Sequence, residues 1–278
     1  MSDPAENRHA NVVGERTTAE NGPLGGRTVA VTRPVGQSAH LADSLAGLGA
    51  TVIAAPLIRI ESPADPAALD DAIARIDSFD WLVFTSANGA SQVLDRLAAL
   101  GRSASTLSST RIAAVGPATA RTVRERGGEV SIIPDRFVAE SLADAFRSGA
   151  SLAGARILVA RAAAARDVLP DALREAGANV ETVHAYRTLS NDHEARRLAD
   201  LIGRQAVDIV TFASSSAVHA LATFLPTDVA RNVQIACIGP VTANTVQGYG
   251  LEVWVQADDH TDEGLLRAIV DALPPSNK

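Results

Sequence analysis

The sequence contains the same short pattern twice, as AAVGPATA at residues 113–120 and as ACIGPVTA at residues 236–243. Proline suits the first turn of a helix, glycine allows an unusual φ angle or a close backbone approach, and a threonine oxygen can accept a helix-start N–H. Each copy is therefore typical of a buried strand that turns into a helix. A helix start offers unpaired N–H donors and the positive end of a dipole, which together can hold an anion. The residues predicted to contact such an anion are Gly116, Thr119, Gly239 and Thr242.

Other polar residues follow predicted strands, at the positions where parallel α/β sheets bind their ligands. Two of them are arginines, and the rest form hydroxyl-rich turns. No GxSxG elbow surrounds the serines, so helix capping or hydrogen bonding to a ligand is favoured over a nucleophile. For the arginines an ordinary surface role stays open. The candidates are Arg33, Thr85, Ser86, Asn88, Arg161, Ser214 and Ser216.

Tyr186 is one of only two tyrosines in the chain. It is interpreted either as a packing aromatic on an extended connector or as a phenol that faces a cleft and donates a proton. The six histidines show no metal-ligand spacing, so no metal site is predicted. The single cysteine, Cys237, lies in a strand pattern and is expected to be a small buried hydrophobe.

The candidate residues are positioned by short apolar runs that alternate with helical patterns. This alternation favours an α/β fold of parallel sheets with helices on both faces. The predicted strands are 28–32, 51–55, 81–84, 111–115, 130–133, 156–160, 180–183, 208–212, 234–238 and 251–255. The predicted helices are 37–48, 67–76, 86–97, 117–126, 139–146, 165–175, 193–204, 215–224, 240–249 and 263–273. Extended connectors are predicted near 57–61 and 185–189.

The chain also matches itself over most of its length. Val29–Arg33 aligns with Ile157–Arg161 at an offset of 128 residues, and Gly116 aligns with Gly239 at an offset of 123. A long run of matches with one length change inside a loop indicates a duplication and two similar α/β units. The matches do not decide how the units divide the chain, because a contiguous division near Gly149 fits them as well as an exchange of halves does.

Composition excludes several classes of protein. The chain has 278 residues and a formal net charge of −7, which argues against a surface for nucleic acid. No apolar run approaches the 18 or so residues of a membrane span, and no signal-peptide pattern opens the chain, so a cytoplasmic protein is predicted. GxGxxG and Walker A patterns are absent. The polar stretch 1–25 is predicted to be a disordered tail.

The order and spacing of six motifs resemble those of the uroporphyrinogen-III synthases, over residues 26–273. The motifs are VTRP at 31–34, FTSANG at 84–89, AVGPATA at 114–120, AYRT at 185–188, FASSS at 212–216 and IGPVTA at 238–243. The resemblance implies two similar doubly wound, parallel-sheet (flavodoxin-like) α/β domains joined by a two-stranded connector. It places domain 1 at 26–57 and 189–278, domain 2 at 58–188, and the connector strands near 57–61 and 185–189.

The resemblance also implies a reaction. These enzymes cyclise hydroxymethylbilane, a linear tetrapyrrole, with inversion of the last pyrrole ring and loss of water, and they need no metal or cofactor. Tyr186 matches the family tyrosine proposed to assist departure of the hydroxyl, and a phenol can donate a proton at neutral pH. Thr242 matches the region of a family threonine near the substrate. Two places depart from the family pattern, Val241 and the four alanines of 162–165.

The expected partner is therefore a small-molecule tetrapyrrole, without nucleic acid or membrane, and the expected oligomeric state is a monomer. The eight carboxylates of the tetrapyrrole must be bound by a protein whose net charge is negative. We therefore expect them to be held locally, by helix starts and by arginines. Two alternatives remain open from the sequence. One is a tetrapyrrole-sensing regulatory module that kept the fold and lost turnover, and the other is a hinge-type solute-binding protein.

Overall fold

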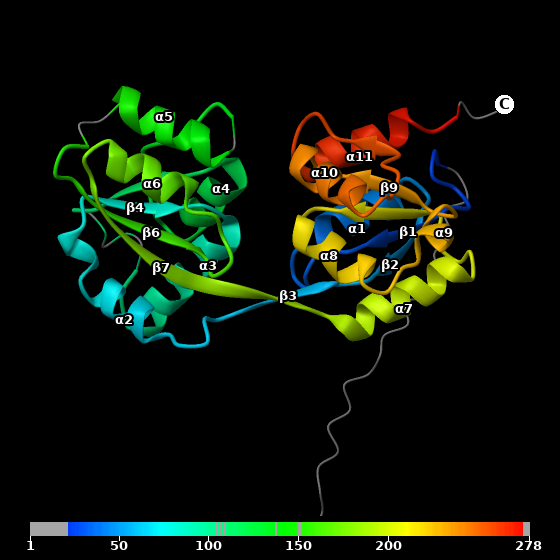
Figure 1. The fold of residues 1–278 in the computed structure, drawn as a ribbon, viewed down its shortest axis with the longest axis horizontal. Helices are drawn as coiled ribbons and strands as arrows, with labels where there is room; N and C mark the ends of the chain where they lie inside the picture. The colour runs from blue at the N-terminus through cyan, green and yellow to red at the C-terminus, as the bar shows by residue number, and fades with distance from the viewer. Residues whose placement is uncertain are drawn as a thin grey trace, which may run out of the picture. The chain divides into compact units, whose positions relative to one another are not determined.

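The structure is a computed structural model that describes residues 22–103, 105, 107, 109–136, 138–149 and 152–274. The chain forms two compact units (Figure 1). Unit 1 contains the described residues up to Ile58 and those from Ser190 onward, and unit 2 is Arg59–Leu189. The chain passes from one unit to the other inside two strands, β3 (Ile58–Glu61) and β7 (Asn179–Ser190).

Unit 1 is built on a parallel sheet with strand order β10-β9-β8-β1-β2. Its strands are β1 (Thr28–Val31), β2 (Thr51–Ala54), β8 (Ile209–Phe212), β9 (Gln234–Cys237) and β10 (Val255–Gln256). Its helices are α1 (Ala39–Gly47), α7 (Asp192–Gly203), α8 (Ser215–Ala222), α9 (Thr227–Ala230), α10 (Pro240–Gly248) and α11 (Asp262–Asp271). Because the strands are parallel, all of their carboxyl ends lie at one edge of the sheet, where helices begin.

Unit 2 has a sheet with strand order β3-β7-β6-β4-β5, in which β7, β6, β4 and β5 are parallel. Besides β3 and β7, its strands are β4 (Trp81–Phe84), β5 (Arg111–Ala114) and β6 (Arg156–Ala162). Its helices are α2 (Ala67–Ala74), α3 (Ala87–Ala99), α4 (Pro117–Glu125), α5 (Ala139–Gly149) and α6 (Val168–Glu175), with one 3-10 turn at Ile76–Ser78.

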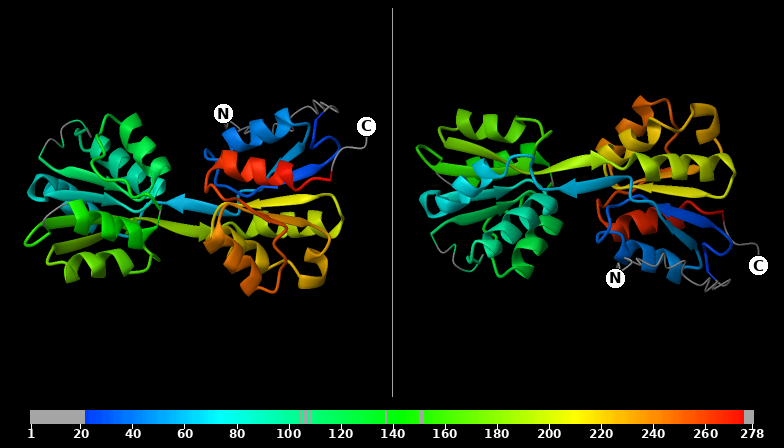
Figure 2. Two further views of the ribbon diagram at one scale, coloured as in Figure 1. Left: turned by 90° about the horizontal axis from the view of Figure 1, so that it is seen from above. Right: turned by 90° about the horizontal axis from the view of Figure 1, so that it is seen from below.

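Both sheets are covered by helices on their two faces (Figure 2). In unit 2, Leu82 and Phe84 of β4 pack on the side of α2, α3 and α4, whereas Trp81 and Val83 pack on the side of α5 and α6. Successive side chains of a strand point to opposite faces, so a strand covered on both faces must be apolar throughout. This explains the unbroken apolar run WLVF.

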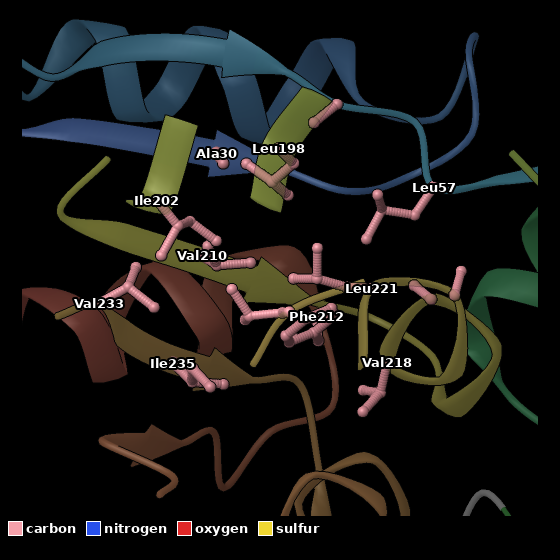
Figure 3. Packing of buried hydrophobic residues seen from close by; sticks show 14 of the residues in the cluster. Ala30, Leu57, Leu198, Ile202, Val210, Phe212, Val218, Leu221, Val233 and Ile235 are labelled. Carbon is pink, nitrogen blue, oxygen red and sulfur yellow. The ribbon is translucent and has the colours of Figure 1, made fainter. Parts of the chain in front are cut away.

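Unit 1 shows the same layering. On one face α1 and α11 pack on the sheet around Val29 and Val31. On the other face Leu198 of α7 and Leu221 of α8 pack against Val210 (Figure 3). The two apolar layers hold the strand ends of each sheet in place, and the candidate residues follow those ends.

The sheets show how the duplicated halves combine. At the offset of 128 residues β1 aligns with β6, β2 with β7 and β4 with β8. In the structure β1 pairs with β8, and β4 pairs with β6. Each sheet therefore combines the first two strands of one copy with the later strands of the other copy. A contiguous division near Gly149 does not describe the chain, because β4 and β6 lie on either side of that residue.

Three predicted strands differ from the structure. Residues 180–183 and 185–189 belong to one continuous strand, β7. Residues 130–133 form only an isolated bridge from Ile132 to Ala113. Residues 251–255 reduce to the short edge strand β10, because Leu251 closes the end of α10 with its N–H bonded to the Val246 carbonyl at 3.3 Å.

The predicted tail is too long at its carboxyl end. Residues 1–21 lie outside the described residues, but Leu24 is fully buried in the core around Val29. Its N–H donates to the Leu48 carbonyl at 3.0 Å. The ordered chain therefore includes residues 22–25, since an apolar side chain placed just before β1 completes that core.

Candidate active site

Tyr186 and Ser86 form a hydrogen-bonded pair in unit 2, with 3.0 Å between Tyr186 Oη and Ser86 Oγ. Ser86 follows β4 and caps α3, where its Oγ accepts the N–H of Gly89 at 3.0 Å. Tyr186 lies on β7 and is 7% exposed. Strands β4 and β7 are the two neighbours of β6 in the sheet, which brings the serine and the phenol to the same edge.

A bulge in the sheet sets the direction of Tyr186. The pairing of β6 with β7 shifts between Arg161 and Ala162, so that Ala162 is opposite Tyr186 and Ala185 is extra. Ala185 and Tyr186 consequently pack in the same apolar cluster, which consecutive residues of a regular strand cannot do. The period-2 pattern of the sequence contains no signal of this bulge.

Gly89 packs closely beside the pair. A Cβ atom at this position would lie 3.3 Å from Ser86 Oγ, which is a tight contact, and 3.7 Å from Tyr186 Cε1, which is an ordinary one. The glycine of the FTSANG motif therefore leaves room mainly for the Ser86 hydroxyl, since it lies inside α3 and not in a turn.

A pocket of about 210 Å³ opens beside the pair. Arg161, at the end of β6, lines it and is only 5% exposed. Its Nη1 forms an ion pair with Asp167, and its Nε is buried without a hydrogen-bond partner. The pocket lining consists of Thr85, Ser86, Ala139, Val159, Arg161, Ala162, Ala165, Arg166, Val168, Leu169, Pro170 and Tyr186.

The first repeated motif begins α4 in unit 2. Gly116 is the N-cap and Pro117 the first helical residue, and no side chain caps this helix start. The φ of Gly116 is −169°, so the unusual backbone angle that its glycine allows is not used. Thr119 is 3% exposed. The first N–H groups of this helix are available for an anion.

The second motif begins α10 in unit 1 in the same way. Gly239 is extended, with φ 178°, and a Cβ there would come within 2.9 Å of the His260 ring. The glycine thus leaves room for the exposed His260 ring, and it has no special φ. Thr242 is buried like Thr119, and Val241 beside it is exposed.

The remaining candidates of unit 1 have mixed environments. Ser214 caps α8 by accepting the N–H of Ala217 at 3.3 Å, and Ser216 is exposed in the first turn of the helix. Arg33 forms an ion pair with Asp262, with 2.6 Å between Nη2 and Oδ1. Asp262 thus balances the guanidinium charge inside the unit, although the Arg33 Nε is buried without a hydrogen-bond partner.

Four of the predicted residues line one pocket: Thr85, Ser86, Arg161 and Tyr186. Asn88, Gly116 and Thr119 belong to the same unit but do not line this pocket, and Arg33, Ser214, Ser216, Gly239 and Thr242 belong to unit 1. Sequence reasoning missed Gly89, Arg166 and Asp167. Only Gly89 carried a signal, as the last residue of the FTSANG motif.

Other reactive groups are sparse in the described part of the chain. Cys237 is fully buried at the end of β9, and burial raises the pKa of its thiol to about 12, which keeps it protonated. No group of three or more His, Cys, Asp or Glu side chains among the described residues could hold a metal ion. None of the helices that the structure describes is long and apolar enough to cross a membrane.

The chain is similar to known proteins of one family. A family model described as uroporphyrinogen-III synthase HemD matches residues 39–267. The uroporphyrinogen-III synthase of Synechococcus elongatus is 35% identical over 255 residues, which are 89% of this chain and 96% of that protein. A putative uroporphyrinogen-III synthase of Methanothermobacter thermautotrophicus is 31% identical over 87% of this chain and 96% of its own length.

The fold agrees with this relationship. A crystal structure of a mutant uroporphyrinogen III synthase from Thermus thermophilus superposes with a TM-score of 0.64 at 20% identity, covering 89% of this chain and 98% of that one. The chain has an α/β fold with parallel sheets, as predicted. From the sequence matches and the shared fold together, the chain belongs to the uroporphyrinogen-III synthase family.

Proposed function

We propose that the protein cyclises hydroxymethylbilane to uroporphyrinogen III, with inversion of ring D and loss of water, in the biosynthesis of tetrapyrroles. Membership of the family supports this activity. The observation in the structure that carries it is the hydrogen-bonded pair Ser86–Tyr186 beside a pocket that contains the buried cation Arg161. This arrangement combines a proposed proton donor with an anion-binding group in one unit.

Tyr186 is the proposed proton donor. Ser86 Oγ accepts the N–H of Gly89, and either hydroxyl of the pair can donate across the 3.0 Å between Ser86 and Tyr186; in the proposed mechanism Ser86 is the donor. The phenolic proton is then left for the substrate hydroxyl, which departs as water. As the phenol loses its proton, the Ser86 hydrogen bond and the positive end of α3 stabilise the phenolate. Such general acid catalysis is typically worth about 10²–10⁴-fold in rate.

Helix starts and Arg161 are proposed to hold the carboxylates of the tetrapyrrole. The starts of α4 at Gly116 and of α10 at Gly239 have no side-chain cap, so their first N–H groups can bind an anion. Buried Thr119 and Thr242 lie in these first helical turns. Thr85, Asn88, Ser214 and Ser216 are proposed as further hydrogen-bond partners of the substrate.

The two units are proposed to be flavodoxin-like domains. Numbered in chain order within unit 1, the strands lie in the order 2-1-3-4-5, which is that of the flavodoxin type. In unit 2, β7-β6-β4-β5 aligns with β2-β1-β8-β9 of unit 1 through the duplication. The protein is also proposed to be cytoplasmic and monomeric. Light scattering on the purified protein tests the monomer by measuring its mass.

The proposed activity is tested by giving the protein freshly generated hydroxymethylbilane and separating the oxidised products into isomers I and III. Hydroxymethylbilane closes without inversion in the absence of catalysis, so isomer I is the background product. Isomer III above that background supports the proposal. Isomer I alone, with tetrapyrrole still bound, would replace it with the sensing module considered from the sequence.

A further inference from the structure

The internal duplication allows the two arginines at the strand ends to be compared directly. Arg33 in unit 1 and Arg161 in unit 2 are related by the offset of 128 residues. Helices α11 and α5 are related by the offset of 123, so that Asp262, the first residue of α11, corresponds to Ala139, the first residue of α5. The same location in the two sheets therefore contains an aspartate in one unit and an alanine in the other.

In unit 1 the aspartate meets the charge of the arginine. The Arg33 and Asp262 side chains are 22% and 16% exposed, and the ion pair joins Nη2 to Oδ1 at 2.6 Å. The carboxylate also lies at the start of a helix, where the dipole favours a negative charge. Unit 1 thus demonstrates that a carboxylate on a short arm fits this location beside the arginine.

In unit 2 the corresponding location is a pocket. Ala139 is one of its walls, and Arg161 and Arg166 are two others, while none of the residues that line it is acidic. The Arg161 side chain is 7% exposed, and its Nε, like that of Arg33 in unit 1, is buried without a hydrogen-bond partner. The ion-pair partner of its Nη1, Asp167, is 64% exposed, and solvent screens a pair with so exposed a partner.

The two arginines therefore differ in their carboxylate partners, because Asp262 is 16% exposed whereas Asp167 is 64% exposed, and a nearly buried cation with so exposed a partner is stabilised by a further anion. We propose that the pocket of unit 2 binds one carboxylate arm of the tetrapyrrole on Arg161, whereas the duplicate location in unit 1 is closed by Asp262 acting as an internal carboxylate. Arg161 is then a substrate-binding residue and Arg33 a structural one. This proposal rests on the proposed function, because it assigns a part of the same substrate.

The size of the pocket agrees with one arm of the substrate. Drug-sized ligands occupy pockets of roughly 300–1,000 Å³. At about 210 Å³ the pocket is too small for a whole tetrapyrrole and large enough for an acetate or propionate arm with part of its ring. Substrates that lack carboxylates on that ring would lose the contact.

The test copies the arrangement of unit 1 into unit 2 with Ala139→Asp. The new carboxylate should pair with Arg161 and exclude the arm of the substrate. Because the substrate would lose a hydrogen bond to a charged group, KM for hydroxymethylbilane should rise about 10- to 100-fold. The change in kcat should be smaller. Ala139→Asn is the matched control, because it adds the same volume without the charge, and its KM should rise much less.

Two further measurements separate the possible outcomes. Binding of uroporphyrin III is monitored by the fluorescence of the porphyrin and should be weaker for Ala139→Asp than for the wild type, whether or not any variant forms isomer III. The isomer III assay of the wild type tests the proposed function separately. Asp262→Ala should lower the thermal midpoint by exposing the charge of Arg33 and leave KM unchanged. An unchanged KM for Ala139→Asp with a folded circular dichroism spectrum, or equal effects of aspartate and asparagine, would overturn the proposal.

Discussion

At the scale of single residues, Ser86 has two tasks that share one oxygen. Its Oγ caps α3 through the N–H of Gly89, and the same hydroxyl reaches Tyr186. A serine that is fixed by the backbone of a helix is a rigid support for a phenol. The cap thereby links the local stability of α3 to the position of the Tyr186 hydroxyl, the proposed proton donor.

Replacing Ser86 with alanine should affect both stability and turnover. Loss of an N-cap costs about 1 kcal/mol in the free energy of unfolding. Loss of the hydrogen bond to a developing phenolate should lower kcat by about tenfold or more. Thermal unfolding and the isomer III assay measure the two effects.

Thr261→Ala is the matched control for this variant, since Thr261 caps α11 by accepting the N–H of Gly264 at 3.0 Å. It should lower stability by a similar amount and leave kcat near the wild-type value. If the two variants had the same kcat, the hydroxyl of Ser86 would be a helix cap only.

Residue types and their place after strands were sufficient to predict Ser86, Thr85 and Arg161 as candidates, whereas Tyr186 became one through its place on a connector and the family resemblance. The structure brings these four to one pocket. The partners of those residues were not predictable. Arg161 and Asp167 are only six residues apart, but the link between Arg33 and Asp262 spans most of the chain and joins the end of β1 to the start of α11.

At the scale of elements, α2 and α3 are joined by a two-pronged ion pair. Arg96 donates to both carboxylate oxygens of Asp70, with Nε–Oδ1 and Nη2–Oδ2 distances of 2.6 and 2.5 Å. The hydrogen bond from Arg96 lowers the pKa of Asp70 from its usual value. The same bond raises the pKa of Arg96. Helix α3 carries Ser86 at its start, so this pair helps to hold the element that positions the site.

Asp70→Asn should therefore remove a pH-dependent contribution to stability. A carboxyl group whose pKa is lower in the folded state stabilises the protein above its unfolded pKa, near 3.9 for aspartate, and loses that contribution as the pH falls through the folded pKa. The thermal midpoint of the wild type should exceed that of the variant at pH 6, and the difference should begin to shrink below about pH 4 and vanish once the pH is below the lowered pKa of Asp70. The effect should be small, because the pair is partly exposed.

The exposed aspartate Asp43 on α1 provides the control. Asp43→Asn should have the same midpoint as the wild type across this pH range. A difference between the wild type and Asp70→Asn that stayed constant down to pH 2 would contradict the linkage to the Asp70 carboxyl group.

Most elements were predictable because strands buried on both faces are uniformly apolar and the helices between them are amphipathic. The errors occurred where tertiary contacts override the local pattern. Residues 130–133 and 251–255 have apolar strand patterns, but the first forms one bridge and the second mostly closes a helix. The bulge that turns Tyr186 depends on the register between β6 and β7 and is therefore invisible in either strand alone.

At the scale of the whole molecule, the duplication was visible in the sequence but the division of the chain was not. Matching offsets describe the copies, whereas the sheets are assembled from one half of each copy. Only strand pairing distinguishes the two arrangements, and pairing such as that of β4 with β6 is a contact between segments far apart in the sequence.

The observed division predicts which fragments fold. A fragment of residues 59–189 contains nearly all of the unit 2 sheet, so it should unfold cooperatively and give dispersed amide resonances. A fragment of residues 22–149 lacks β6, the central strand of unit 2, and β8, a central strand of unit 1, so it should not fold. Two-state unfolding of the second fragment would contradict the exchange of halves.

The central claim is that Tyr186 supplies the proton that converts the substrate hydroxyl into water. The most direct measurement compares kcat and KM for isomer III formation by the wild type and by Tyr186→Phe, which keeps the ring in its cluster and removes only the hydroxyl. We predict that kcat falls about 10²–10⁴-fold while KM changes little. A fall in kcat of less than about tenfold would contradict the claim and assign the catalysis to positioning of the substrate.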